Sequence, residues 1–221
     1  MLQQNSNLRF ICVEADKLFY RYLTRNIVAL RRNLPHIRID SIFAFVGRDV
    51  HPINMVGGGG TKRAQVEGKT QGNYKTFFCK NKDITVVLVD SIIADCDKTC
   101  VRLLKSDVDG FDYDIINSAI ETVTRSKPLL YFEMDYTDED QMENFIRCVT
   151  MLHKLGYEHW YLFDNQGNFL IKERDIEYIN QLIFHVFGQK TRIYPRTIHY
   201  LDVLVCTNEE EKFIDSVVET Y

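Results

Sequence analysis

Val101-Arg102-Leu103-Leu104-Lys105-Ser106-Asp107-Val108-Asp109-Gly110-Phe111 is the stretch that decides the fold. Its short apolar start predicts a buried strand over residues 101–106. Two acids and a glycine follow, where that strand should end. A helical pattern comes next, with one apolar face formed by Ile115, Ile116, Ala119, Ile120 and Val123. Strand, acidic turn and helix make up the unit of a doubly wound α/β sheet, which binds ligands at the carboxyl ends of its strands. Asp107 and Asp109 therefore lie where a functional site is expected.

Length and composition favour one α/β domain over residues 1–221. Hydrophobic residues are 45% of the chain, enough for a substantial core, and the net charge of −4 gives no case for nucleic acid binding. No run of about 18 apolar residues predicts a transmembrane segment. Residues 1–7 lack a signal-peptide pattern, and the six scattered cysteines suggest reduced thiols, so a cytoplasmic setting is expected. No histidine or cysteine pair completes a zinc site near Cys96 and Cys100, and we predict no metal.

The segment before the central stretch predicts a strand at 8–13, a helix at 17–34 and a second strand at 37–46. The helix carries four arginines opposite its apolar stripe, and no acid occurs between Asp16 and Asp40. These arginines are Arg21, Arg25, Arg31 and Arg32. A solvated basic face is one interpretation of this pattern, and a surface for a membrane or an acidic partner is the other.

Residues 51–71 have little pattern and are predicted to be irregular chain. They contain four successive glycines, Gly57 to Gly60, followed by Thr61-Lys62. A phosphate-binding loop needs the spacing G-x-x-x-x-G-K-[ST], which is absent here. A flexible loop or lid is the better interpretation.

The rest of the chain alternates strands and helices and then changes character. Strands are predicted at 85–89, 129–132, 159–163 and 203–206, with a helix after Thr137 and another from about Asn208. The alternation favours a mostly parallel sheet with helices on both faces. The turn at 165–168 and the last strand favour an antiparallel C-terminal edge.

Three acids end predicted strands: Glu14, Asp107 and Glu133. We expect them along one edge of the sheet. Like charges held close together are costly unless a ligand or cation offsets them, so a cationic or hydroxyl-rich ligand is expected there. An acid after an early strand commonly binds the ribose hydroxyls in nucleotide-binding α/β folds, and Glu14 fits that position.

The triplet Asp107-Val108-Asp109 also permits two other functions. D-x-D is the metal-binding motif of nucleotide-sugar glycosyltransferases. D-x-D-G is the nucleophile loop of phosphatases like the haloacid dehalogenases, but their usual threonine is Phe111 here, and their nucleophile lies near the start of the domain.

Residues 104–112 (LKSDVDGFD), followed by Ile115-Ile116, resemble the signature K-[IV]-D-[VI]-E-G-x-E of the FkbM-type methyltransferases. Other segments resemble further family motifs in the same order, from about residue 10 to 206. They are residues 13–16 (VEAD) with Leu23 and Asn26-Ile27, 43–49 (FAFVGRD), 87–91 (VLVDS), 127–133 (KPLLYFE) and 200–204 (YLDVL).

The resemblance implies an S-adenosylmethionine-dependent methyltransferase with a Rossmann-like class I fold and a seven-stranded sheet ordered 3-2-1-4-5-7-6. Glu14, followed by Ala15, would hold the ribose hydroxyls of the cofactor. Val46 and Gly47 would flank its adenine. Asp107 and Asp109 would face its methionine end and the methyl acceptor.

The resemblance also suggests catalytic roles for four side chains. The methyl acceptor is expected to be a hydroxyl of a small molecule or glycan, which must be held in line and deprotonated. Asp107 is the first candidate for the base or for orienting the acceptor, with Asp109 beside it. Lys105 either pairs with Asp107 or only neutralises the acids, and Glu133 would line the acceptor side.

Three departures from the family pattern raise a second hypothesis. The family's glutamate is Asp109 here, and its proline is Ala15. The first strand and its glycine-rich turn, commonly D-x-G-A-x-x-G, are not found in residues 1–221. The alternative function is thus a shortened, non-catalytic binding or scaffolding protein. The missing strand leaves three options: the strands ending at Glu14 and Asp107 pair directly, another segment fills the gap, or residues 1–221 are a fragment. We favour direct pairing, and we expect S-adenosylmethionine to bind weakly or not at all.

Overall fold

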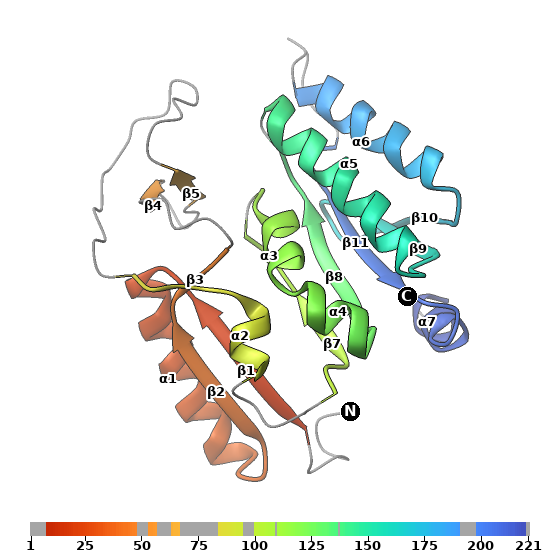
Figure 1. Cartoon of the computed structure of the whole chain (residues 1–221). Coiled ribbons are helices and arrows are strands. Elements are labelled where there is room, and N and C mark those ends of the chain that lie inside the picture. The colour runs from red at the N-terminus through yellow and green to blue at the C-terminus, as the bar shows by residue number, and fades with distance from the viewer. Residues whose placement is uncertain are drawn as a thin grey trace. The chain divides into compact units, whose positions relative to one another are not determined.

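The computed structural model describes residues 8–47, 53–56, 63–66, 84–94, 100–108, 110–136, 138–190 and 198–219. They form a mixed α/β structure, which confirms the fold class (Figure 1). The chain divides into two units, Met1–Leu88 and Val89–Tyr221. The doubly wound arrangement and the single domain remain predictions.

The first unit is built on a strand–helix–strand segment. Strand β1 (Arg9–Glu14) and strand β2 (Arg38–Phe43) pair in parallel and flank helix α1 (Lys17–Asn33). The helix begins at Asp16, whose buried carboxylate accepts hydrogen bonds from the Leu18 and Phe19 backbone N–H groups. Its inner face packs on a core of Ile27, Ile37 and Ile39. The helix ends just before Leu34-Pro35, as expected where proline restricts the preceding residue.

Two further strand pairs complete the described part of this unit. Strand β3 (Phe45–Val46) pairs in parallel with β6 (Val86–Val87), and β4 (Ile53–Val56) pairs antiparallel with β5 (Arg63–Val66). The strand predicted at 37–46 is therefore broken at Ala44, whose N–H donates to the Glu14 carbonyl at 3.2 Å. The prediction that all of 51–71 is irregular is wrong for β4 and β5, and Gly57 to Gly60 lie outside the described residues.

The second unit is built on a five-stranded sheet in the order β10-β9-β11-β8-β7. The strands are β7 (Leu103–Lys105), β8 (Leu129–Met134), β9 (His159–Asp164), β10 (Phe169–Glu173) and β11 (Leu201–Cys206). Strands β7 and β8 pair in parallel, and the other three pairs are antiparallel. The antiparallel C-terminal edge is confirmed. The mostly parallel sheet is wrong for this unit, because β11 enters between β8 and β9 in the opposite direction.

Six helices belong to the described part of the second unit. They are α2 (Val89–Ala94), α3 (Asp112–Ser118), α4 (Ile120–Ser126), α5 (Glu139–Lys154), α6 (Ile176–Lys190) and α7 (Glu211–Val218). Helices α5 and α6 lie side by side (Figure 1). Helix α6 has no counterpart in the sequence prediction. The single helix predicted after Asp112 is broken at Ala119, although Ile116 and Val123 are fully buried as expected.

Strand β7 does not match the prediction for the central stretch. It covers only Leu103–Lys105 and lies at the edge of its sheet, and the Leu103 side chain is 56% exposed. The prediction of a buried strand over 101–106 is therefore wrong. An edge strand is hydrogen-bonded to a neighbour on one side only. The apolar residues of this strand did not show whether it lies at the edge or in the centre of the sheet.

Direct pairing of the strands that end at Glu14 and Asp107 is also not found. Among the described residues β1 pairs with β2, and β7 pairs with β8 in a separate sheet. No helix in the described ranges is long and apolar enough to cross a membrane.

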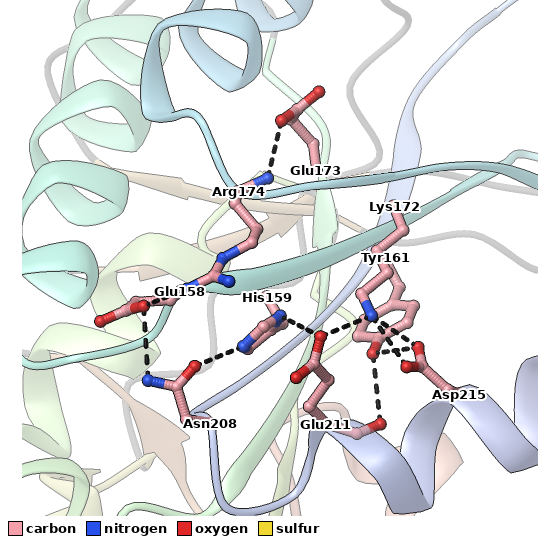
Figure 2. Close-up of polar contacts among 9 residues, drawn as sticks. All are labelled: Glu158, His159, Tyr161, Lys172, Glu173, Arg174, Asn208, Glu211 and Asp215. Atoms are coloured by element: carbon pink, nitrogen blue, oxygen red, sulfur yellow. Dashed lines mark hydrogen bonds and ion pairs between the residues drawn. The ribbon is translucent and has the colours of Figure 1, made fainter.

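A polar cluster attaches α7 to the sheet (Figure 2). Lys172 Nζ of β10 lies 2.8 Å from both Glu211 Oε1 and Asp215 Oδ1 of α7. The Tyr161 hydroxyl donates to Asp215 Oδ1 at 2.7 Å. Ile214, on the same helix, packs against Tyr161. Ion pairs and apolar contacts thus hold the C-terminal helix α7 against the sheet.

The cluster continues through a buried histidine. His159 Nε2 lies 2.6 Å from Asn208 Oδ1, and its Nδ1 lies 3.1 Å from Glu211 Oε1 (Figure 2). The Asn208 amide donates to Glu158 Oε2, which also accepts from Arg174. The amide orientation leaves the Asn208 oxygen facing the ring, so His159 lies between two acceptor oxygens.

Candidate active site

Three acidic residues lie at matching positions on, or just after, three neighbouring strands of the second unit. Lys105 of β7 is in register with Tyr131 of β8, and Glu133 of β8 is in register with Asp202 of β11. Asp107 follows Lys105 by two residues, as Glu133 follows Tyr131. This places Asp107, Glu133 and Asp202 across the carboxyl ends of β7 and β8, where α/β folds bind ligands.

Glu133 and Asp202 oppose each other on one face of the sheet. Their neighbours Phe132 and Val203, also paired, point to the other face and are fully buried. The Glu133 side chain is itself buried, and Asp202 is half-buried. Like charges directly opposite each other destabilise a sheet, so a positive group at this edge would stabilise the pair.

Burial and the negative charge of this site raise the pKa values of three nearby groups. Burial, and then the Asp107 charge, raise the pKa of Asp202. Burial and the Asp202 and Asp107 charges raise the pKa of Tyr131. Burial, followed by Glu133 and Asp202, raises the pKa of Tyr200, the residue before β11. The site therefore disfavours further negative charge and favours a cationic ligand.

Lys105 contributes the positive charge nearest to Asp107. Its Nζ lies 3.2 Å from Asp107 Oδ2 and 5.7 Å from the centroid of the Tyr131 ring. This contact fits both alternatives given for Lys105, pairing with Asp107 and neutralising the acids. Both partners are more than half exposed, so the pair contributes little to stability.

The loop between β7 and α3 is held against β8 by two of its residues. Gly110 has φ of +97°, and a Cβ there would lie 3.2 Å from the Asp135 carbonyl oxygen, so the turn requires glycine. Asp112 is fully buried and interacts with the Ser106 side chain and with the Glu133 and Val108 backbone. Burial raises the pKa of Asp112 to about 6. Asp109 lies outside the described residues.

The residues predicted to bind a cofactor in the first unit gather at the ends of β1 and β3. Glu14 Oε1 accepts from the Asp16 N–H at 2.6 Å, which fixes the orientation of the carboxylate beside Ala15. Gly47, directly after Val46, is buried and donates its N–H to the Val87 carbonyl at 3.1 Å. The shared edge of Glu14 with Asp107 and Glu133 remains a prediction, as do the binding and catalytic roles of all these residues.

Sequence reasoning missed Asp202, Tyr131, Tyr200 and Asp112 as candidate site residues. Asp202 had a signal, since it is a lone acid inside the apolar strand Leu201–Cys206. Its position opposite Glu133 could not be predicted without knowing that β11 pairs with β8. In the described ranges no group of three metal-binding side chains could hold an ion.

Comparison with known proteins identifies the family to which this chain belongs. Residues 10–159 match the FkbM methyltransferase domain, so the chain belongs to that family. The match covers the β1–α1–β2 segment, the acidic loop and β8 through α5. Among curated proteins no relative matches the chain. The family assignment indicates a methyltransferase.

Proposed function

We propose that this domain transfers a methyl group from S-adenosylmethionine to a hydroxyl group of a small molecule or glycan. The observation that carries the proposal is the row of Asp107, Glu133 and Asp202 across neighbouring strands. Asp107 and Glu133 lie within residues 10–159, which match the methyltransferase family, and Asp202 lies outside them.

Several of the candidate residues fit this cofactor chemically. S-adenosylmethionine has a positive sulfonium and an ammonium group, and the acidic row would offset such charge. Its ribose presents two hydroxyls, which suit a carboxylate at a strand end such as Glu14. Glu14 Oε1 is held by the Asp16 N–H, and Oε2 accepts from no group in the described part of the chain. Val46 and Gly47 would flank the adenine.

The bound cofactor would supply an electrophilic methyl carbon. The acceptor oxygen forms the new O–C bond as the C–S bond breaks, and the hydroxyl proton must leave. Asp107 would accept that proton, because its carboxylate is exposed and lies two residues after the end of β7. Glu133 and Asp202 would hydrogen-bond the acceptor or attract the positive end of the cofactor. Holding the acceptor in line would be the main catalytic contribution.

The test is a transfer assay with methyl-labelled S-adenosylmethionine and a panel of hydroxyl-bearing small molecules and glycans. We expect one acceptor class to become labelled. In Asp107→Asn turnover should fall by about 100-fold, a typical contribution of a positioned base, because asparagine keeps the shape but cannot take the proton.

Arg147→Gln is the matched control, since Arg147 pairs with Glu143 on the outside of α5, away from the acidic row. Its turnover should equal that of the wild type. Full activity in Asp107→Asn would exclude this residue as the base. Absence of transfer to every acceptor would favour the non-catalytic binding function.

A further inference from the structure

The outer face of α1 is cationic along its whole length. Four cations form one row at helical spacing, and all four are exposed. They are Lys17, Arg21, Arg25 and Arg32. The row spans roughly 22 Å at the α-helical rise. No acidic side chain in the described residues pairs with any of them, and no acid occurs between Asp16 and Asp40.

Apolar side chains lie in the adjacent row of the same face. Leu18 is 46% exposed and Tyr22 is 48% exposed, one turn apart, with exposed Ala29 two turns further on. Val28, 52% exposed, lies among the cations. An exposed apolar row beside a row of cations is the pattern of a helix that lies on a membrane surface.

The positive surface continues past the end of the helix. Arg9, Arg31 and Arg38 line a hollow of about 490 Å³ in the same unit. Arg9 pairs with Asp40 at 2.6 Å, and Arg31 donates to the Ile39 carbonyl. Arg38 has no acidic partner in the described part of the chain.

We propose that this face of α1 binds the surface of an anionic lipid bilayer. The cationic row would lie on the lipid phosphates and carboxylates, and Leu18, Tyr22 and Val28 would enter the headgroup layer. Each cation near such a surface strengthens binding, and an apolar row beside it adds hydrophobic burial. The inner face of α1 stays packed on β1 and β2, so the helix would bind without leaving its unit.

The apolar row favours a bilayer over the other polyanions. Contacts to nucleic acid phosphates use cations and hydrogen-bond donors, and they would leave the aliphatic side chains in water. Protein interfaces tend to have an apolar centre with charges at the rim. Here the charges run the full length of the face next to the apolar row. This inference does not depend on the proposed methyl transfer.

The test is co-sedimentation of the 221-residue chain with vesicles. Vesicles of phosphatidylcholine alone are compared with vesicles containing about one third phosphatidylserine, a surface that attracts basic segments. We expect binding to the anionic vesicles only, and weaker binding at about 0.5 M salt because salt screens the charges. Equal binding to both kinds of vesicle, or to neither, would overturn the proposal.

Two triple variants separate local charge from total charge. The first variant combines Arg21→Gln, Arg25→Gln and Arg32→Gln. It should bind anionic vesicles about 100-fold more weakly, because it loses three cations near the membrane surface. The matched control removes the same charge from exposed positions on α4 and α5: Arg125→Gln, Arg147→Gln and Lys154→Gln. The control should bind like the wild type. Equal loss in both variants would mean that only net charge matters, which contradicts a defined face.

A third variant tests the apolar row. Leu18→Gln with Tyr22→Gln should weaken binding to anionic vesicles, and the loss should remain at high salt because it is not electrostatic. Circular dichroism on each variant confirms that α1 is retained. Wild-type vesicle binding by this variant, or binding of the unmodified chain to DNA or RNA but not to vesicles, would reject the bilayer as the partner.

Discussion

Asp202 of β11 lies directly opposite Glu133 of β8 in an antiparallel ladder. The two acids share one face of the sheet, and Asp107, two residues after the edge strand β7, adds negative charge that helps burial to raise the pKa of Asp202. Asp107, Glu133 and Asp202 thus concentrate negative charge at one edge of the sheet. The pair therefore supports a binding role for this edge.

Asp202→Asn should increase the free energy of unfolding at neutral pH by about 0.2–1 kcal/mol, since it removes the cross-strand repulsion. Because folding raises the pKa of Asp202, the wild type loses stability as pH rises through that pKa, and the variant should lose less. Urea denaturation at several pH values measures this. A destabilised variant would show that Asp202 is held by compensating contacts within the chain.

Asp112→Asn should remove the part of the pH dependence of stability that the Asp112 carboxyl causes. Burial raises the pKa of Asp112 to about 6, so the native state binds more protons than the unfolded state between about pH 4 and 6. The wild type should become less stable as pH rises through this window. A two-unit shift corresponds to roughly 3 kcal/mol, the upper limit for the gain in the variant at pH 7. Thermal unfolding from pH 4 to 7 is the measurement, and parallel curves for both proteins would contradict the prediction.

Gly110→Ala should destabilise the loop that carries Asp107. A residue with a side chain is strained at φ of +97°, and its Cβ would lie close to the Asp135 carbonyl. We expect a loss of about 1–3 kcal/mol in urea denaturation, together with reduced methyl transfer. Gly167→Ala is the control, because φ is +83° there but no atom lies within 4 Å of the added Cβ. A smaller loss of stability in Gly110→Ala than in Gly167→Ala would contradict a close contact between the added Cβ at position 110 and the Asp135 carbonyl.

Lys172→Met should loosen α7 without unfolding the sheet. Hydrogen bonds from Lys172 lower the pKa of both Glu211 and Asp215. Acids with a lowered pKa stabilise the fold above their ordinary pKa of about 4, and this contribution is lost as pH falls below it. Amide exchange in α7 should be faster in the variant at pH 7, and the two proteins should converge at low pH. Unchanged exchange in α7 would show that Ile214 packing alone holds the helix.

Calorimetric titration of the 221-residue chain with S-adenosylmethionine should show weak binding. The family's glycine-rich turn lets the backbone approach the methionine end of the cofactor, and no such motif occurs in residues 1–221. Glu14→Gln should weaken the residual binding further through the ribose hydroxyls. Low-micromolar binding by the wild type would show that another segment replaces that turn.

The local sequence determined most of the elements. Apolar periodicity located α1, α5 and the strands β1, β8 and β9, because a helix or strand must place its apolar residues on one side. The signature around Asp107 and the segment ending at Glu133 indicated the family, which the match over residues 10–159 confirms. The Lys105–Asp107 pair was also predictable, since two residues separate the partners.

Only the tertiary structure decided which strands became neighbours. Strand order depends on ladders between distant segments, and a strand's own residues do not specify its partner. The edge position of β7, the entry of β11 beside β8 and the resulting Glu133–Asp202 pair were therefore beyond sequence reasoning. Helix α6 was missed because its apolar residues surround it too evenly to give a clear stripe: Ile179, Ile183 and Val186 are buried, whereas Tyr178 and Phe184 are exposed.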